Sequence, residues 1–202
     1  MIRNLIFDMG NVLIYFSPRH FIKHFGVTDP EMEKLLLREV YGSVEWVLMD
    51  WGTLDEDECE RRVLPRLPEE LWPTARKLIH WWDRPILPVP GMEAFVRKCK
   101  AAGYGIYLLS NASRRLHSYW DKVPASEVFD GIVVSSDLHL VKPLPDIYRH
   151  VLDRFQLKAE ECLFVDDMPL NIAGALQVGI PGFVFHDNVE ELEKRVFGAE
   201  GQ

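Results

Sequence analysis

Carboxylates stand at the ends of two short apolar runs in this sequence. Asp8 follows the run at residues 5–7, and the pair Asp166 and Asp167 follows the run at 162–165. If both runs are parallel strands of one sheet, their ends meet at the same edge and the three carboxylates converge. Converging carboxylates repel one another unless a cation lies among them, and an all-oxygen site with few protein ligands suits Mg2+. The spacing therefore predicts a magnesium site.

Groups that donate hydrogen bonds occur at corresponding places. Ser110 and Asn111 follow the apolar run at 105–109, and Lys142 follows the run at 131–134 after a short interval. A hydroxyl, an amide and an ammonium supply donors for phosphate oxygens, and a carboxylate of the same cluster can act as a covalent nucleophile. The combination predicts phosphoryl transfer to an aspartate.

Apolar runs alternating with amphipathic segments predict the fold that positions these side chains. The runs expected to be strands buried on both faces lie at residues 5–7, 105–109, 131–134, 162–165 and 182–185. The segments with helical patterning lie at residues 92–102, 145–155, 170–178 and 189–197. Strand alternating with helix predicts an α/β fold, a doubly wound, Rossmann-like parallel sheet with helices on both sides.

Residues 15–88 interrupt this alternation, because they have helical patterning and no convincing strand. The segment leads into the proline-rich run 84–91, which is typical of a stiff extended linker. We expect residues 15–88 to form an all-helical cap over the carboxyl ends of the strands, with residues 1–14 and 89–202 forming the catalytic core. The linker also suggests that the cap opens and closes over the site.

Composition and charge exclude several classes of protein. Hydrophobic residues make up 48% of the 202 residues and charged residues 27%, which is enough apolar material for a globular core. The formal net charge is −8, so a nucleic acid or an anionic membrane would be repelled, and neither partner is expected. Three widely spaced cysteines and the lack of a long apolar run predict a soluble, cytoplasmic protein. The sequence does not indicate an oligomeric state.

Four ordered segments resemble the motifs of the haloacid dehalogenase-like (HAD) hydrolase superfamily, most of whose members are Mg2+-dependent phosphatases. The segments lie at residues 7–13, 109–111, 141–143 and 164–171. The helical insert after the first motif is similar to the cap of one HAD subgroup, so the resemblance covers essentially the whole chain. Within the superfamily, the sequence looks most like glucose-1-phosphate phosphatases and the phosphatase domain of soluble epoxide hydrolases.

The resemblance implies roles for the residues that would touch the phosphate. It makes Asp8 the nucleophile that forms an aspartyl-phosphate. Ser110 and Asn111 would bind the transferring phosphoryl group, and Lys142 would bridge the phosphate and Asp8.

The resemblance also implies a set of metal ligands. These are Asp8, the main-chain carbonyl of Gly10 and Asp167. Asp166 would be a further ligand or a supporting partner, and Asn171 would hold the acidic pair in place.

Gly10 is a departure from the family pattern, in which a second aspartate two residues after the nucleophile is the general acid and base. Such a group usually contributes about 100- to 10,000-fold to the rate. Because an anomeric oxygen leaves more readily than an ordinary alkoxide, the glycine favours a sugar 1-phosphate as substrate. We also predict His20 as a replacement proton donor at the cap entry and Trp51 as a substrate contact.

The leading function is therefore an Mg2+-dependent phosphatase of a small phosphorylated metabolite. One alternative is a 2-haloacid dehalogenase, which uses the same nucleophile on carbon without a metal; the paired Asp166 and Asp167 count against it. The other is a non-catalytic phosphate-binding regulatory protein, against which the intact Asp8 and Lys142 count.

Overall fold

The computed structural model describes residues 1–198 and has a five-stranded parallel sheet at its centre, in the order β3-β2-β1-β4-β5. The strands are β1 (Asn4–Phe7), β2 (Gly105–Ser110), β3 (Gly131–Val134), β4 (Cys162–Asp166) and β5 (Gly182–Val184). β1 lies in the middle, paired with β2 on one side and β4 on the other. The strands that carry polar residues at their ends are therefore neighbours.

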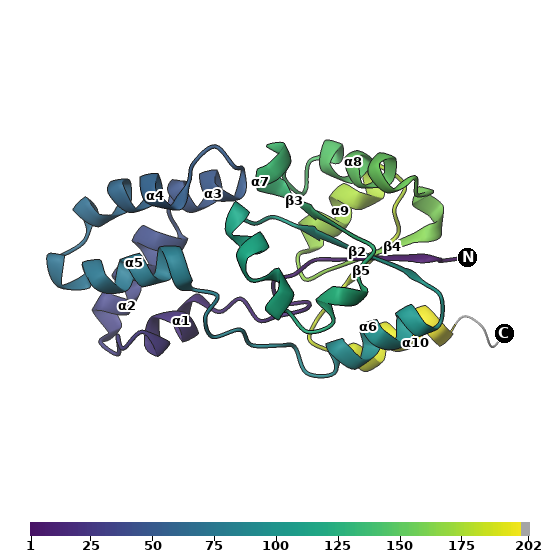
Figure 1. Ribbon diagram of the computed structural model, residues 1–202, viewed down its shortest axis with the longest axis horizontal. Coiled ribbons are helices and arrows are strands. Elements are labelled where there is room, and N and C mark those ends of the chain that lie inside the picture. The colour runs from purple at the N-terminus through teal and green to yellow at the C-terminus, as the bar shows by residue number, and fades with distance from the viewer. Residues whose placement is uncertain (199–202) are drawn as a thin grey trace.

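Helices cover both faces of the sheet, α6 and α10 on one and α8 and α9 on the other (Figure 1). Their bounds are α6 (Met92–Ala101), α8 (Pro145–Phe155), α9 (Pro169–Gln177) and α10 (Val189–Phe197). Side chains alternate along β1 as the pleat requires: Leu5 and Phe7 join the core with α6 and α10, whereas Ile6 joins the core with α8 and α9. The predicted doubly wound α/β fold is confirmed.

Two strands run one residue further than their apolar runs predict. β2 includes Ser110, in register with Val134, and β4 includes Asp166, in register with Val184. The prediction ended each strand where hydrophobicity ends, but pairing is a property of the main chain and continues through the polar residue. Each of these polar side chains therefore projects from a hydrogen-bonded strand.

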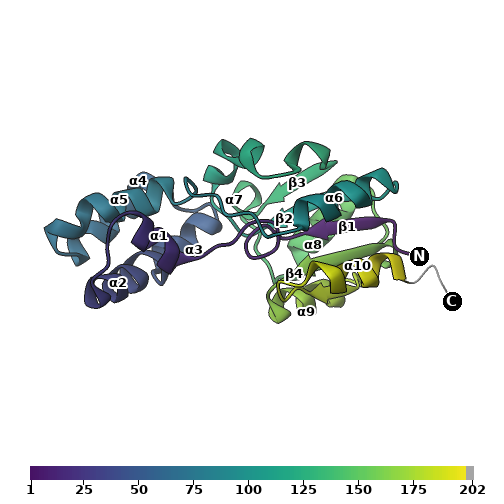
Figure 2. The same cartoon turned by 90° about the horizontal axis from the view of Figure 1, so that it is seen from below.

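Between β1 and α6 the described chain is helical, as predicted for this segment. The α-helices are α1 (Pro18–His24), α2 (Pro30–Leu36), α3 (Val44–Asp50), α4 (Glu56–Val63) and α5 (Trp72–Trp81). Shorter turns are the π-helical η1 (Leu37–Tyr41) and the 3-10 turns η2 (Leu64–Arg66) and η3 (Glu69–Leu71). These helices gather to one side of the core, beyond the carboxyl ends of the strands (Figures 1 and 2).

The two segments that join these helices to the core run side by side. The main-chain N–H of Tyr15 donates to the carbonyl of Leu87 at 2.7 Å, and that of Val89 donates to Leu13 at 3.0 Å. An antiparallel bridge joins Ile14 to Pro88 between them. The predicted proline-rich linker is thus one half of a short paired ribbon.

Short helical turns complete the core around the carboxyl edge of the sheet. They are η4 (Arg114–Ser118), η5 (Trp120–Lys122), η6 (Ser126–Val128), α7 (Ser135–Leu138) and η7 (Ala159–Glu161). The longest helix within residues 1–198, α8, has 11 residues, and no helix in this part of the chain has the length and apolarity needed to cross a membrane.

Candidate active site

A pocket of about 300 Å³ opens between the carboxyl edge of the sheet and the inserted helices. The structure brings most of the predicted site residues to its wall, namely Asp8, Gly10, Ser110, Asn111, Lys142, Asp167 and Asn171. They converge because β2, β1 and β4 are adjacent parallel strands whose carboxyl ends meet at this edge.

The Lys142 side chain lies between two carboxylates. Its Nζ is 2.8 Å from Asp8 Oδ1 and 2.7 Å from Asp166 Oδ2, and the three residues are buried. Burial and the charge of Asp166 raise the pKa of Asp8 to about 6, against the opposing effect of Lys142. Burial alone would lower the pKa of Lys142, but the two carboxylates raise it above its ordinary value. Lys142 is therefore an ammonium ion held against Asp8.

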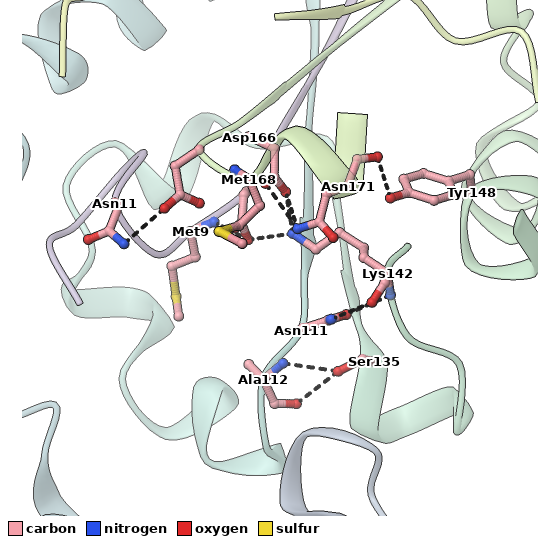
Figure 3. A network of polar contacts seen from close by, with 12 residues as sticks. Met9, Asn11, Asn111, Ala112, Ser135, Lys142, Tyr148, Asp166, Met168 and Asn171 are labelled. Atoms are coloured by element: carbon pink, nitrogen blue, oxygen red, sulfur yellow. Dashed lines mark hydrogen bonds and ion pairs between the residues drawn. The ribbon is translucent and has the colours of Figure 1, made fainter. Parts of the chain in front are cut away.

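Both oxygens of Asp166 are engaged by donors of the protein. Oδ1 accepts from the Met168 main chain at 2.8 Å, and the Asn171 amide donates to both oxygens at 3.0 and 3.1 Å. The main-chain carbonyl of Asn171 accepts in turn from the Tyr148 hydroxyl at 2.7 Å, so that Asn171 lies between Asp166 and Tyr148 (Figure 3). Together with Lys142, these contacts favour a supporting role for Asp166 rather than direct ligation of a metal.

Asn11 connects Asp167 to the start of the inserted helices. Its amide nitrogen donates to Asp167 Oδ2 at 3.0 Å, and its amide oxygen accepts from the Phe16 main chain at 3.1 Å. The residue has a left-handed backbone with φ of 55°, which asparagine tolerates better than most residues. Asn11 had no predicted role of its own, although an asparagine directly after Gly10 was a signal of this backbone geometry.

The three carboxylates fit a divalent cation. Asp8, Asp166 and Asp167 each offer an oxygen within 4.8 Å of the others. Both carboxylate oxygens of Asp166 already accept hydrogen bonds from the protein. The residues best placed to hold an ion are therefore Asp8 and Asp167, with Gly10 lining the same pocket. An all-oxygen donor set of this size suits Mg2+.

Asn111 and Ser110 line the pocket at the end of β2, with different surroundings. The Asn111 amide donates to the Lys142 carbonyl at 2.9 Å and accepts from the Lys142 main chain at 2.8 Å (Figure 3). The Asn111 side chain therefore positions Lys142, and the phosphate contact implied for it stays a prediction. Ser110 is only 2% exposed and lines the pocket.

The structure does not bring His20 or Trp51 to the pocket. His20 is exposed on α1, with its ring beside that of His24, because Phe21 and Ile22 supply the buried face of that helix. The Trp51 indole donates to the main-chain carbonyl of His139 at 2.8 Å outside the pocket. Neither placement supports the roles predicted for these side chains.

The pocket wall formed with the inserted helices is largely apolar, a feature that was not predicted from the sequence. Its side chains are Phe16, Trp46, Met49, Ile79, Trp82 and Tyr119. Phe16 is central, with ring centroids 5.0 Å from Trp82 and 5.9 Å from Trp46. Tryptophan in an amphipathic helix usually indicates core packing, so its spacing alone did not distinguish a pocket wall from a core.

Asp50 is the carboxylate that the inserted helices contribute to the pocket, and it too had no predicted role. It is the last residue of α3, and its main-chain carbonyl accepts from Ser135 Oγ at 2.5 Å. Burial and the charge of Asp8 raise the pKa of Asp50 to about 8, although Lys142 and the Ser113 main-chain N–H act in the opposite direction. The sequence feature that could have indicated Asp50 was an acidic residue at the end of an amphipathic helix in the segment expected to cover the strand ends.

Known proteins of similar sequence include hydrolases and phosphatases. The pattern of a family described as "Hydrolase: haloacid dehalogenase-like hydrolase" matches residues 2–179. A sesquiterpene phosphatase of Aspergillus oryzae is 28% identical over 194 residues, covering 91% of this chain and 90% of that protein. A D-ribitol-5-phosphate phosphatase of Bacteroides thetaiotaomicron is 24% identical over 195 residues, covering 91% of each.

A solved structure supports the fold. A HAD family enzyme of Bacteroides thetaiotaomicron, crystallised with magnesium and inorganic phosphate, superposes with a TM-score of 0.68 at 18% identity. The superposition covers 93% of this chain and 96% of that one.

Proposed function

This chain belongs to the haloacid dehalogenase-like hydrolase family, and we propose from that premise that it is an Mg2+-dependent phosphatase acting through an aspartyl-phosphate at Asp8. The observation that carries the proposal is the Lys142 ammonium, 2.8 Å from Asp8 Oδ1 beside a cluster of three carboxylates. This arrangement neutralises part of the charge that accumulates when a phosphate dianion approaches a carboxylate.

Different residues have different roles in the first step, the formation of the aspartyl-phosphate. Asp8 supplies the attacking oxygen, with its other oxygen held by Lys142 and by the Met9 main chain at 2.7 Å. Asp166, itself held by Asn171, keeps Lys142 in place. Mg2+ bound by Asp8, Asp167 and the carbonyl of Gly10 would add positive charge next to the phosphate oxygens.

The apolar wall favours a phosphate monoester with an apolar organic group. Sugar hydroxyls removed from water need hydrogen-bonding partners, and the side chains of Phe16, Met49 and Ile79 supply none. The similarity to a sesquiterpene phosphatase points in the same direction. The sugar 1-phosphate predicted from Gly10 is the second candidate, because an anomeric leaving group still has the least need of an acid.

The proposal is tested by measuring phosphate release from isoprenyl, alkyl and aldose monophosphates. We expect release that requires Mg2+, stops in EDTA and is abolished by Asp8→Asn, with the highest kcat/KM for an apolar monophosphate. Preference for aldose 1-phosphates would support the second candidate instead.

The same assay separates the alternative functions. Metal-independent halide release from a 2-haloacid, without phosphate release, would support a dehalogenase. Binding of inorganic phosphate without turnover of any ester would support a regulatory protein.

A further inference from the structure

Departure of an alcohol from a phosphate monoester requires a proton on the leaving oxygen, and the position two residues after Asp8 is Gly10, which cannot supply one. Five titratable side chains line the pocket, namely Asp8, Asp50, Tyr119, Lys142 and Asp167. The source of the proton can therefore be sought among them by elimination, on the premise that the proposed phosphatase function holds.

Four of the five are committed to other tasks. Asp8 and Asp167 belong to the carboxylate cluster, and Lys142 is bound between Asp8 and Asp166. The Tyr119 hydroxyl donates to the Met9 sulfur at 3.7 Å, and burial raises the pKa of Tyr119 well above its ordinary value, so this phenol holds its proton too tightly. Asp50 remains; it lines the same pocket from the end of α3, where its carboxyl accepts a hydrogen bond from the Ser113 main chain.

Asp50 is held at this position by contacts between α3 and α7 (Figure 1). The Asp50 carbonyl accepts a hydrogen bond from Ser135 Oγ. Trp51, the next residue, makes two hydrogen bonds with His139: its indole N–H donates to the His139 carbonyl at 2.8 Å, and its carbonyl lies 3.0 Å from His139 Nδ1. A Cβ on Gly52 would lie 2.1 Å from the Ser136 carbonyl oxygen, so only glycine permits this approach. The end of α3 is thus docked on the core rather than free.

We propose that Asp50 is the general acid and base of this site. In the first step Asp8 forms a bond to phosphorus while the bond from phosphorus to the leaving oxygen breaks, and the Asp50 carboxyl gives its proton to that oxygen. In the second step the Asp50 carboxylate takes a proton from the water that attacks the aspartyl-phosphate. Asp8 and the protonated Asp50 are then regenerated, and hydrogen phosphate is released.

The electrostatic surroundings of Asp50 suit this role. Burial and the charge of the neighbouring Asp8 raise the pKa of Asp50 to about 8. The Asp50 carboxyl is therefore protonated at neutral pH, and its pKa is close enough to that pH for the proton to be transferred. A general acid is most effective when its pKa lies near the working pH.

The test compares Asp50→Asn on two substrates that differ in their need for an acid. An alkyl phosphate releases a poor leaving group, so its kcat/KM should fall by about 100- to 10,000-fold. p-Nitrophenyl phosphate releases a stable phenolate, so its kcat/KM should fall far less. Because the second step also loses its base, the variant should release a rapid burst of about one nitrophenolate per enzyme, followed by slow turnover.

Controls separate this role from a structural one. Asp57→Asn changes an exposed acid of α4 and should leave both substrates unaffected. Asp50→Glu should restore part of the activity on the alkyl phosphate. An equal loss on both substrates, or an unchanged kcat/KM for the alkyl phosphate, would overturn the assignment of Asp50.

The experiment distinguishes a wrong assignment of Asp50 as general acid and base from a wrong assignment of the protein as a phosphatase. If the wild type hydrolyses both esters and Asp8→Asn does not, the phosphatase proposal stands whatever Asp50→Asn does. If the wild type hydrolyses no phosphate ester, both proposals fall together.

Discussion

Arg115, in the turn that follows β2, forms an ion pair with Asp83, which follows α5 at the end of the inserted helices. The Arg115 Nε lies 2.6 Å from Asp83 Oδ1, and the Asp83 side chain is only 4% exposed. The pair therefore joins the last helix of the insert to the core loop behind Asn111. Neither residue lines the pocket, but the pair connects the two parts that form it.

Replacing Arg115 should destabilise the protein substantially. Arg115→Ala leaves the Asp83 carboxylate buried without its partner, which typically costs about 3 to 5 kcal/mol. Urea unfolding measures this change, and Arg114→Ala is the matched control, because Arg114 is exposed and should change the unfolding free energy by less than about 0.5 kcal/mol. Equal effects of the two substitutions would mean that the pair contributes no more than an exposed arginine.

Removing the Asn11 side chain should weaken magnesium binding. Asn11→Gly keeps the left-handed backbone but removes the amide that orients Asp167, and loss of such a supporting hydrogen bond typically lowers metal affinity about 10- to 100-fold. The half-saturating Mg2+ concentration for phosphate release should rise accordingly. Gln156→Gly is the control, since Gln156 is also left-handed but ends α8 away from the pocket. Identical half-saturation in all three proteins would contradict this role of Asn11.

Asp50 should make the stability of the wild type depend on pH in a defined direction. Its pKa is about 8 in the folded protein and near the ordinary value of 3.8 when unfolded, so the folded state binds its proton more tightly. This contribution is fully present below pH 4 and is lost as the pH rises through 8. Asp50→Asn has no such loss.

The measurable consequence is a difference between two unfolding curves. In magnesium-free buffer, the unfolding free energy of Asp50→Asn minus that of the wild type should increase by a few kcal/mol from pH 4 to pH 9, because each pKa unit corresponds to about 1.4 kcal/mol. Asp57→Asn should give a flat difference. A flat difference for Asp50→Asn as well would mean that its carboxyl ionises as if exposed.

The convergence of the polar residues was predictable from sequence because it depends on one rule. Ser110 and Asp166 each end a parallel strand and Asp8 directly follows one, and parallel strands present their ends at one edge. No knowledge of side-chain packing was needed. The strand bounds at Ser110 and Asp166 were less predictable, since the apolar pattern ends before the main-chain pairing does.

The facing wall of the pocket could not be predicted in the same way. The contribution of Asp50 depends on how α3 docks against α7, and that contact joins residues about 85 positions apart in the sequence. His20 illustrates the opposite error, because its position at the start of the insert was visible but the helix phase set by Phe21 and Ile22 turns it outward. Pockets formed by two docked parts depend on tertiary contacts that periodicity does not encode.

The central position of β1 has a consequence for the order in which the protein can fold. Asn4 pairs with Gly105 in β2 and with Cys162 in β4, so β1 has no partner among the residues that follow it closely. The insert between them consists of helices whose contacts are local and form quickly, whereas closing β1 onto its partners requires a loop of about 100 residues. During synthesis, β1 is made about 100 residues before β2 and has no strand to pair with until β2 emerges. β1, which the proposed nucleophile Asp8 directly follows, is therefore open to mispairing and aggregation in the nascent chain until β2 is made.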